Sequence, residues 1–452
     1  MSRVHPRRIR GFPTARPIEV FRFRWMLGTM DRTDAVCSAT RAGALARWEE
    51  FLPRALEYGA LRNRVQPRHP HVSRLSPAIR SRLVTTQELV ESLLATHAFA
   101  RVEKLVQELL WRDYWKGWLE LRPGVWTAYR RELEHLKRNG DPAILHRAQE
   151  VMAGRGGIAV MDRFARELIE TGYLHNHARM WWAGYWIHVE RLPWVLGADF
   201  FYRHLLDADP ASNTLGWRWV AGLQTKGKTY LPRRSNLEKY CSPVWMEDTT
   251  GLERIDDAVV STLKLPEEPA ATRVPWMPLW ERPELPAGRW GLWIHGEDLT
   301  PELSALGRFK PECVLTILDD PLMQSVGLSE GRIAYLRHAL ADARSRAAAH
   351  FGCPVEHRGE GTLAHHLAGV AREHRLDGWV AMRPAVGPLA DALPEIESAL
   401  QRAGLTIHWC RRRWDELRWP DAASGFFPFW EQTRARLASG TKPNSRQGVL
   451  PL

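Results

Sequence analysis

The chain has 452 residues, 44% of them hydrophobic and 25% charged, a composition typical of globular proteins with two or three buried cores. No apolar run is long enough to span a bilayer, no apolar segment follows the basic residues 1–10, and the five cysteines form no Cys-x-x-Cys pair. We therefore expect no membrane span, secretory signal, disulfide framework or metal site, and a reducing, cytoplasmic location.

The formal net charge of +11 is unevenly distributed along the chain. Residues 1–240 contain 39 Lys and Arg against 24 Asp and Glu, whereas the remainder is slightly acidic. A basic half predicts contact with a polyanion such as nucleic acid, and an ordinary solvated basic surface is the alternative.

Residues 1–40 are rich in Arg and predict a partly ordered basic arm. The first helix is expected between Thr40 and Tyr58, because Thr40 is a good N-cap and apolar residues recur there at helical spacing. Farther along, Ser73-Arg74-Leu75-Ser76 precedes another expected helix. Hydroxyl and backbone N–H groups at a helix N-terminus can bind an anion, although a simple helix cap would have the same sequence.

The next expected helix carries Glu108 and Trp111, which lie three residues apart and hence on one face. An aromatic face is a common platform for an extruded nucleotide base. A single Trp is nevertheless more often a core residue, so this pair alone leaves both interpretations open.

The segment 161–219 combines a strongly apolar run with a dense set of polar residues. Apolar residues recur at helical spacing from Met180 to Trp194 and predict one buried helix. Polar residues flank it at His175, Asn176, Arg179, Asp207, Asp209 and Asn213. Burial of such groups is unfavourable unless they pair with one another or with a ligand, so they form either a structural network or a ligand site.

Residues 241–288 are rich in Pro and acidic residues and predict a semi-rigid linker. Beyond it, strands are expected to alternate with helices, which indicates a doubly wound α/β domain with a parallel sheet over 289–435, before a tail at 436–452. The expected strands are 290–295, 313–318, 355–357, 379–382 and 406–410, and the expected helices are 331–350, 363–375 and 390–403. No Gly-x-Gly-x-x-Gly follows the first strand, so no dinucleotide site is predicted there.

Two motifs carry a resemblance to a known family. One is Thr171-Gly172-Tyr173-Leu174-His175-Asn176, followed by Arg179-Met180 and by Asp207-x-Asp209-x-x-x-Asn213-x-x-x-Trp217-x-Trp219. The other is Glu108-x-x-Trp111-Arg112-Asp113-Tyr114. Together they resemble the flavin-binding core of the photolyase/cryptochrome family. The resemblance implies a large all-α FAD-binding domain over 41–240.

FAD is the cofactor that this resemblance implies, bound in a folded conformation. The implied FAD contacts are Tyr58, Ser73, Leu75, Ser76, Arg112, His175, Asn176, Arg179, Asp207, Asp209 and Asn213. Arg179 and Asp207 are expected to pair beside the isoalloxazine ring, where the guanidinium would stabilise negative charge on the reduced ring. Asn213 is expected to face N5 of that ring, and a neutral residue there is typical of the repair enzymes.

A substrate cavity is implied in the same way, with the Glu108 carboxyl group bonded to the lesion and the Trp111 indole stacked on it. The residues that match its catalytic set are Glu108, Trp111, Met180, Asn213 and Trp219. Trp217 and Trp194 match the first two members of the family's electron-transfer chain.

The segment 222–236 departs from ordinary photolyases and looks more like that of the divergent bacterial photolyases that bear an iron–sulfur cluster. The four Cys of that group are absent, so no iron–sulfur cluster is expected. Basic residues in this segment would suit phosphate contacts, which give affinity without sequence preference, and a solvated basic loop is the alternative. These residues are Lys226, Lys228, Arg233 and Arg234.

The α/β half is similar to the antenna domain of the same family, which normally precedes the flavin domain. Residues 291–299, 318–321 and 425–430 carry this likeness. It implies a circular permutation of the usual domain order, or a fused cousin, and it assigns no antenna chromophore.

The leading hypothesis is a monomeric, blue-light-driven DNA repair flavoprotein, a deoxyribodipyrimidine photolyase-like lyase acting on UV-damaged DNA. It would split pyrimidine dimers by electron transfer from reduced FAD. The alternative is a cryptochrome-like sensor that binds FAD and photoreduces without repairing DNA. The altered segment 222–236, and His177 in place of the usual Arg, keep that alternative open.

Overall fold

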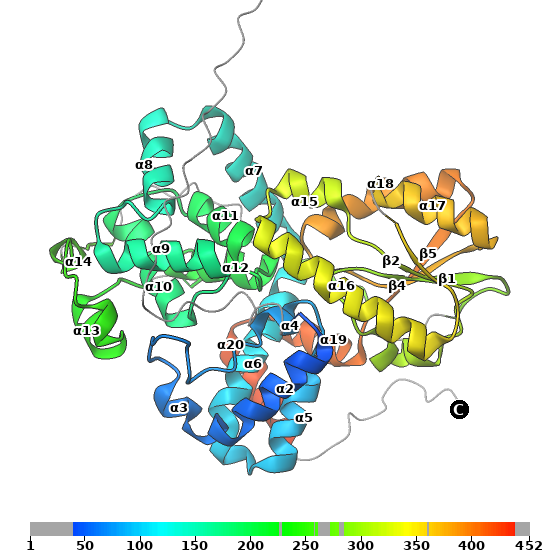
Figure 1. The fold of residues 1–452 in the computed structure, drawn as a ribbon, viewed down its shortest axis with the longest axis horizontal. Helices are drawn as coiled ribbons and strands as arrows, with labels where there is room; N and C mark the ends of the chain where they lie inside the picture. The colour runs from blue at the N-terminus through cyan, green and yellow to red at the C-terminus, as the bar shows by residue number, and fades with distance from the viewer. Residues whose placement is uncertain are drawn as a thin grey trace, which may run out of the picture.

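The computed structural model describes residues 39–225, 228–256, 258–260, 272–279, 284–358 and 361–438. It consists of a helical part, a five-stranded sheet flanked by helices, and a last segment that returns to the helical part (Figure 1). The predicted basic arm falls almost wholly outside the described residues. Among the residues that are described, no helix is long and apolar enough to cross a membrane.

The helical part is built from amphipathic helices around one large hydrophobic core. Its helices are α2 (Arg41–Phe51), α3 (Tyr58–Leu61), α4 (Ser76–Arg80), α5 (Thr86–Thr96), α6 (Phe99–Glu120), α7 (Pro123–Asn139), α8 (Pro142–Met152), α9 (Ala159–Thr171), α10 (Asn176–Gly184), α11 (Trp194–His204), α12 (Pro210–Val220), α13 (Arg234–Tyr240) and α14 (Glu253–Asp256). Thr40 caps α2 as predicted, because its hydroxyl accepts a hydrogen bond of 3.1 Å from the backbone N–H of Gly43. The helix expected to reach Tyr58 instead changes to a 3₁₀-helix, η1 (Leu52–Glu57), around Pro53.

The single buried helix predicted from Met180 to Trp194 is wrong at its end. Helix α10 passes into a π-helical turn, η2 (Tyr185–Val189), and the chain then leaves helical geometry at Arg191, whose φ is 54°. Pro193 explains the break, because proline cannot donate the next helical hydrogen bond and disfavours helical geometry in the residue before it. Trp194 therefore begins a separate helix, α11.

The start of the Pro-rich segment packs against the helical part. Cys241 pairs with Val65 through an isolated β-bridge, and Trp245 is buried against Phe164 and His69. Residues 257, 261–271 and 280–283 of this segment lie outside the described residues.

The α/β region contains a parallel sheet, as predicted. Its strands are β1 (Trp290–Ile294), β2 (Val314–Thr316), β3 (Val355–His357), β4 (Gly378–Met382) and β5 (Thr406–Cys410), in the spatial order β3-β2-β1-β4-β5. The helices between them are α15 (Asp320–Val326), α16 (Glu330–Phe351), α17 (Leu363–His374) and α18 (Pro388–Arg402).

The two faces of the sheet belong to different cores. Leu292 and Ile294 of β1 join the large core that extends into the helical part, together with residues of α16. Trp293 points to the opposite face, where a second core forms with α17 and α18. This alternation is the period-two pattern of a strand that is buried on both sides.

The end of the described chain returns from the sheet to the helical part, so that α20 lies beside the much earlier helix α6 (Figure 1). This return consists of α19 (Arg413–Arg418), η6 (Trp419–Ala423) and α20 (Phe426–Ala438). Gly117 of α6 permits the approach, because a Cβ there would lie 2.6 Å from Cα of Trp419.

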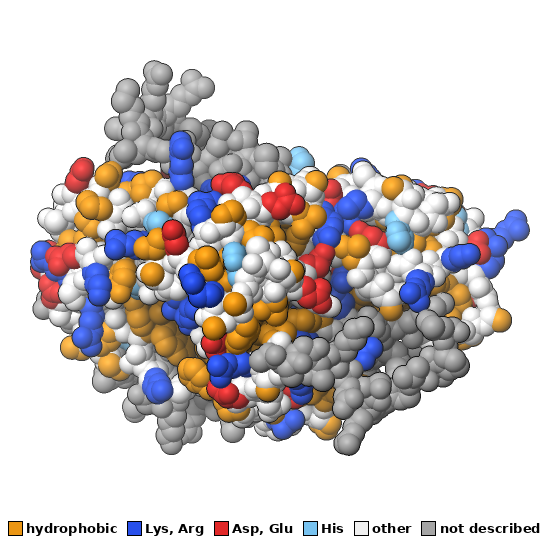
Figure 2. All heavy atoms as spheres, turned by 90° about the horizontal axis from the view of Figure 1, so that it is seen from below, with side chains coloured by type: hydrophobic (Ala, Val, Ile, Leu, Met, Phe, Trp, Pro, Cys, Tyr) orange, Lys and Arg blue, Asp and Glu red, His pale blue; other side chains and the backbone are white. Residues whose placement is uncertain are grey.

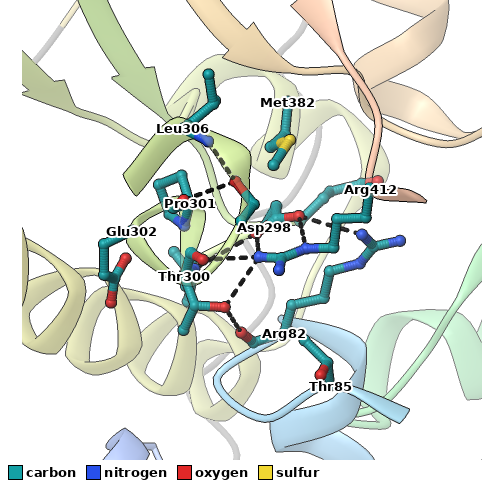
Figure 3. Close-up of polar contacts among 12 residues, drawn as sticks. Arg82, Thr85, Asp298, Thr300, Pro301, Glu302, Leu306, Met382 and Arg412 are labelled. Carbon is teal, nitrogen blue, oxygen red and sulfur yellow. Dashed lines mark hydrogen bonds and ion pairs between the residues drawn. The ribbon is translucent and has the colours of Figure 1, made fainter. Parts of the chain in front are cut away.

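A buried ion network joins the helical part to the sheet (Figure 3). Asp298 follows β1, and its carboxylate oxygens accept hydrogen bonds of 2.7 and 2.8 Å from Arg412, which follows β5. Arg82, from the turn after α4, lies 3.2 Å from the same carboxylate and 2.6 Å from Asp415. Burial alone would raise the pKa of Asp298, but the guanidinium groups outweigh this effect and lower the pKa to about 2.

Candidate functional site

A cavity of about 620 Å³ opens in the helical part, within the range of ligand pockets. It brings together 16 of the 21 site residues predicted from sequence, although Tyr58 and Trp219 lie 161 residues apart in the chain. Those that line it are Tyr58, Ser73, Leu75, Ser76, Glu108, Trp111, Arg112, His175, Asn176, Arg179, Met180, Asp207, Asp209, Asn213, Trp217 and Trp219.

Two arginines converge on one buried carboxylate at the wall of this cavity. The two terminal nitrogens of Arg179 lie 3.0 and 3.1 Å from the two oxygens of Asp207, a planar fork against a carboxylate. Arg112 of α6 adds a contact of 3.1 Å to Asp207. Burial by itself would raise the pKa of Asp207, but the two guanidinium groups outweigh it and hold this pKa below its ordinary value.

A second buried carboxylate, Asp209, organises the start of α12. One oxygen accepts hydrogen bonds of 3.0 and 3.1 Å from the backbone N–H groups of Ala211 and Ser212, so Asp209 is the N-cap of this helix. Its other oxygen lies 2.7 Å from Lys116 and 3.5 Å from Arg80. Burial alone would raise the pKa of Asp209, but Lys116 and Arg80 outweigh this effect and keep the pKa well below its ordinary value.

Lys116 and Arg80 were missed by the sequence prediction. Helical spacing could have indicated Lys116, since it follows Glu108 and Arg112 at intervals of four residues and so shares their face of α6. Arg80 offered no such local signal, because its partners lie on α12 and after β1.

The cavity wall also contains buried polar atoms without a hydrogen-bond partner among the described residues, including Nε2 of His175, Oγ of Ser212 and Nε1 of Trp217. Nδ1 of His175 accepts a hydrogen bond of 3.1 Å from the backbone N–H of His177. Burial and the nearby His69 lower the pKa of His175 well below its ordinary value, so the ring is neutral at neutral pH. Its free Nε2–H is then a donor available to a ligand, because unpaired buried polar groups are rare and costly.

Glu108 and Trp111 lie at another part of the wall, on the cavity side of α6. The Glu108 carboxylate lies 2.8 Å from Lys104 and 3.3 Å from Arg62, and Arg62 also lines the cavity. The Trp111 indole packs against Trp115, with ring centroids 5.2 Å apart. The Glu108 carboxylate and the Trp111 indole therefore line the same cavity.

Asn213 and Trp217, on α12, form another part of the cavity wall. The side-chain amide of Asn213 donates a hydrogen bond of 2.8 Å to the backbone carbonyl of Ala198. Trp217 is buried against Gly197, where a Cβ would come within 2.3 Å of its indole ring. Helices α11 and α12 approach this closely only because residue 197 has no side chain.

Trp194 is the one predicted site residue of the helical core that does not line the cavity. Its ring lies 5.5 Å from that of Tyr129 on α7. The Trp217 ring instead contacts Phe201 at 5.1 Å and the tryptophans Trp182 and Trp186 at 6.1 and 6.5 Å. The sequence prediction treated these two tryptophans as core residues only.

The predicted DNA-binding residues that the structure describes lie outside the cavity wall. Lys226 is not among the described residues, whereas Lys228 and Arg233 are exposed. Arg234 is held by Glu238 at 2.8 Å. Tyr230 packs on Trp219 with ring centroids 5.8 Å apart, which places this segment beside the cavity. From below, exposed hydrophobic side chains are interspersed with Lys and Arg over the helical part (Figure 2).

Four of the five cysteines are described, and none of these four forms a disulfide with another described residue. In the part of the chain that the structure describes, the only group of potential metal ligands is Glu356, Glu373 and His374 in the α/β region. Arg358 contacts both glutamates and so offsets part of their negative charge.

Comparison with known proteins relates the helical part to one family. Residues 105–257 match the family described as the FAD binding domain of DNA photolyase. The deoxyribodipyrimidine photo-lyase of Alkalihalophilus pseudofirmus is 30% identical over 193 residues, which are 41% of this chain and 39% of that protein. The Thermus thermophilus photo-lyase is 37% identical over 130 residues, 28% of this chain and 30% of that protein.

Among solved structures, a bacterial class III photolyase from Agrobacterium tumefaciens matches with a TM-score of 0.38 and 24% identity, over 44% of this chain and 42% of that chain. The chain spans about two fifths of the length of the curated relatives that it matches, 39% and 38% for two of them. Residues 105–257, within the helical part, are therefore similar to the FAD binding domain of DNA photolyase.

Proposed function

We propose that this protein is a light-driven DNA repair flavoprotein that splits pyrimidine dimers. The observation that carries the proposal is the convergence of Glu108, Trp111, Met180, Asn213 and Trp219 on one cavity with the Arg179–Asp207 pair. A polar pocket of this size, with a carboxylate and indoles at one end and a charge network at the other, suits a flat cofactor beside an extruded base.

The residues present fit FAD. The unpartnered Nε2 of His175 and the hydroxyl of Ser212 are buried donors that a ligand in the cavity would satisfy, and Ser73, Ser76 and Arg112 add donors suited to a diphosphate. Tyr58, Leu75, Asn176, Asp209 and Asn213 complete the proposed FAD contacts. When bound and reduced, FAD supplies the electron that opens the dimer after light absorption.

This chain's own residues would prepare the site for that chemistry. The positive fork of Arg179, held by Asp207, would stabilise negative charge next to it, and Asn213 would remain neutral at every pH. Glu108 would accept or donate a hydrogen bond to the extruded lesion, while Trp111 and Trp219 would stack on its bases. Trp217 and Trp194 are the proposed route by which an electron reaches the cofactor.

We further infer that Lys226, Lys228, Arg233 and Arg234 contact DNA phosphates beside the cavity, which would give affinity without sequence preference. The likeness of residues 291–299, 318–321 and 425–430 to the antenna domain supports a circular permutation. In this interpretation the flavin domain over 41–240 and the linker over 241–288 precede an antenna-like domain over 289–435. No antenna chromophore or iron–sulfur cluster is part of the proposal.

The test is repair of a UV-irradiated oligonucleotide, single- and double-stranded, by the purified and chemically reduced protein in blue light and in darkness. Loss of dimers in light only is the expected result. The absorption spectrum of the same sample reports whether flavin is bound. A sample that contains flavin and repairs neither substrate would refute the repair function.

A light sensor is the second candidate, supported by the divergent segment 222–236 and by His177, whose Nδ1 lies 2.9 Å from the carbonyl oxygen of Asn63. His177 is thereby engaged in a local contact and its pKa is lowered by burial. A protein that binds and photoreduces flavin but leaves dimers intact would favour this candidate.

A further inference from the structure

Helix α20, near the end of the described chain, contributes an aromatic ring to the back of the proposed substrate site. The ring of Phe426 stacks on the indole of Trp111, with centroids 3.6 Å apart and planes at 7°. Phe426 is only 4% exposed. Aromatic pairs in proteins more often lie 4.5–7 Å apart in offset or edge-on geometries, so this is an unusually complete face-to-face contact.

The contact lies on the side of the indole away from the cavity. Trp111 and Trp115 line the cavity, whereas Phe426 does not. Tyr114 meets both members of the stack edge-on, at 5.6 Å from Trp111 and 5.5 Å from Phe426. One face of the indole is therefore covered by Phe426, and its opposite side remains for the cavity.

Phe426 is itself held firmly. The ring of Trp430 stacks near it at 6.5 Å and 10°, and Trp430 in turn stacks on Phe99 of α6 at 6.3 Å. The hydroxyl of Tyr114 donates a hydrogen bond of 2.9 Å to the carbonyl of Ser424, two residues before the start of α20. These contacts leave the Trp111 ring little freedom to rotate, because Phe426 on one face and Tyr114 beside it are both fixed.

We propose that Phe426 is a positioning residue for substrate recognition: it holds the Trp111 indole in the orientation that stacks on an extruded base of damaged DNA. The inference rests on the proposed repair function. It assigns a role in the site to a helix that follows the α/β region, far from the flavin domain in the sequence. A flat ring at position 426, and not merely an apolar one, is what this role requires.

The test uses the full-length, flavin-loaded protein and a short oligothymidylate, either UV-irradiated or untreated. Phe426→Leu keeps an apolar side chain but removes the flat face, Phe426→Tyr restores it, and Phe429→Leu is the matched control. Phe429 lies on the same helix and is 0% exposed, but its ring contacts are with Phe426 and Tyr114 and not with Trp111. Flavin content and thermal midpoint are measured for every variant.

Phe426→Leu should weaken binding of the irradiated oligonucleotide about fivefold or more, the lower end of base–aromatic stacking, without changing binding of the untreated one. Phe426→Tyr and Phe429→Leu should bind the irradiated oligonucleotide as the wild type does. If Phe426→Leu yields no folded protein, Phe426→Met provides the same comparison with a flexible apolar side chain.

The inference is overturned if Trp111→Ala abolishes the preference for irradiated DNA while Phe426→Leu retains it. It is also overturned if Phe429→Leu lowers the preference as much as Phe426→Leu, since the effect would then be general destabilisation. A wild-type protein that binds both oligonucleotides equally would refute the repair function itself, and the role of Phe426 with it.

Discussion

Arg179 and Asp207 form a two-pronged ion pair at the cavity wall, with nitrogen–oxygen distances of 3.0 and 3.1 Å. The Nε of Arg179 also donates a hydrogen bond of 2.7 Å to the carbonyl of Leu174, so the guanidinium plane is fixed by three contacts. The positive charge of Arg179 is therefore preorganised in the cavity wall to bind an anionic or electron-rich ligand.

Replacing Arg179 by Lys should lower flavin content, because an ammonium group cannot reproduce the planar fork. The loss of a hydrogen bond to a charged group corresponds to about 1.5–3 kcal/mol, or roughly a tenfold or greater fall in affinity for FAD. Titration of the apoprotein with FAD measures this change. Arg138→Lys, at an exposed pair with Glu134, is the control and should bind FAD normally.

Glu108→Ala should reduce repair while leaving flavin bound. The Glu108 carboxylate, which contacts Lys104 and Arg62 at the cavity wall, would no longer form its proposed hydrogen bond to the extruded lesion. Removal of one hydrogen bond to a charged group predicts about a tenfold or larger loss in repair rate. Glu103→Ala, on the same helix with its carboxylate paired to Arg434, should not affect repair. Unchanged repair by Glu108→Ala would exclude the proposed role of this carboxylate.

Trp217→Phe should slow photoreduction of bound flavin, because phenylalanine is a much poorer electron donor and Trp217 is the tryptophan of the proposed chain that lines the cavity. Chemically reduced Trp217→Phe should still repair DNA, since the relay is then not needed. Time-resolved absorption in blue light measures the rate. Trp48→Phe, distant and bonded to Ser92, should photoreduce as the wild type does.

Gly197→Ala should destabilise the protein by about 1–3 kcal/mol, because the new methyl group would overlap the Trp217 indole between α11 and α12. Gly369→Ala is a matched control on a helix, where nothing lies within 4 Å of the added Cβ. It should stabilise the protein by up to about 1 kcal/mol through helix propensity. Urea denaturation of both variants tests the pair, and equal effects would contradict the packing argument.

Stability should fall at acid pH as Asp298 is protonated. Its pKa is lowered from 3.8 to about 2 by Arg412 and Arg82, so its stabilising contribution is complete above pH about 4 and disappears as the pH falls toward 2. The loss amounts to about 2 kcal/mol. Asp298→Asn should be less stable at pH 7 by about 3–5 kcal/mol, because two buried guanidinium groups lose a carboxylate, and its stability should vary less with acid pH.

Denaturation at a series of pH values tests whether the stability falls as Asp298 is protonated. Asp421→Asn serves as the control, since its pair with Arg436 is exposed and such pairs contribute at most about 1 kcal/mol. A wild-type protein whose stability rises between pH 5 and pH 3 would contradict the role of Asp298.

Much of the fold follows from local sequence patterns. The strands 355–357 and 406–410 have the predicted bounds, because β-forming residues are bounded there by turns and helices. The helix through Trp194 was predicted too long, since apolar periodicity was followed across Pro193. The cavity residues were identified from motif resemblance, because spacing alone left a structural network and a ligand site equally open.

The partners of these residues were beyond the reach of local patterns. Lys116 could have been inferred from helical spacing, but Arg80 and Phe426 reach their partners by tertiary packing. Nothing near Phe426 in the sequence indicates that its ring contacts a residue of α6. Such contacts depend on how the helical part and the sheet dock, which propensity and periodicity do not encode.

The return of α20 to α6 has a consequence for biosynthesis. Trp414 donates its indole hydrogen bond to Asp113, 301 residues earlier in the sequence, and the Trp111–Phe426 stack joins segments still farther apart. Contacts of such high sequence separation form late, because long loops must close first. While the chain emerges N-terminal end first, the helical core can assemble, but the face of α6 that packs on α20 stays uncovered until α20 has left the ribosome.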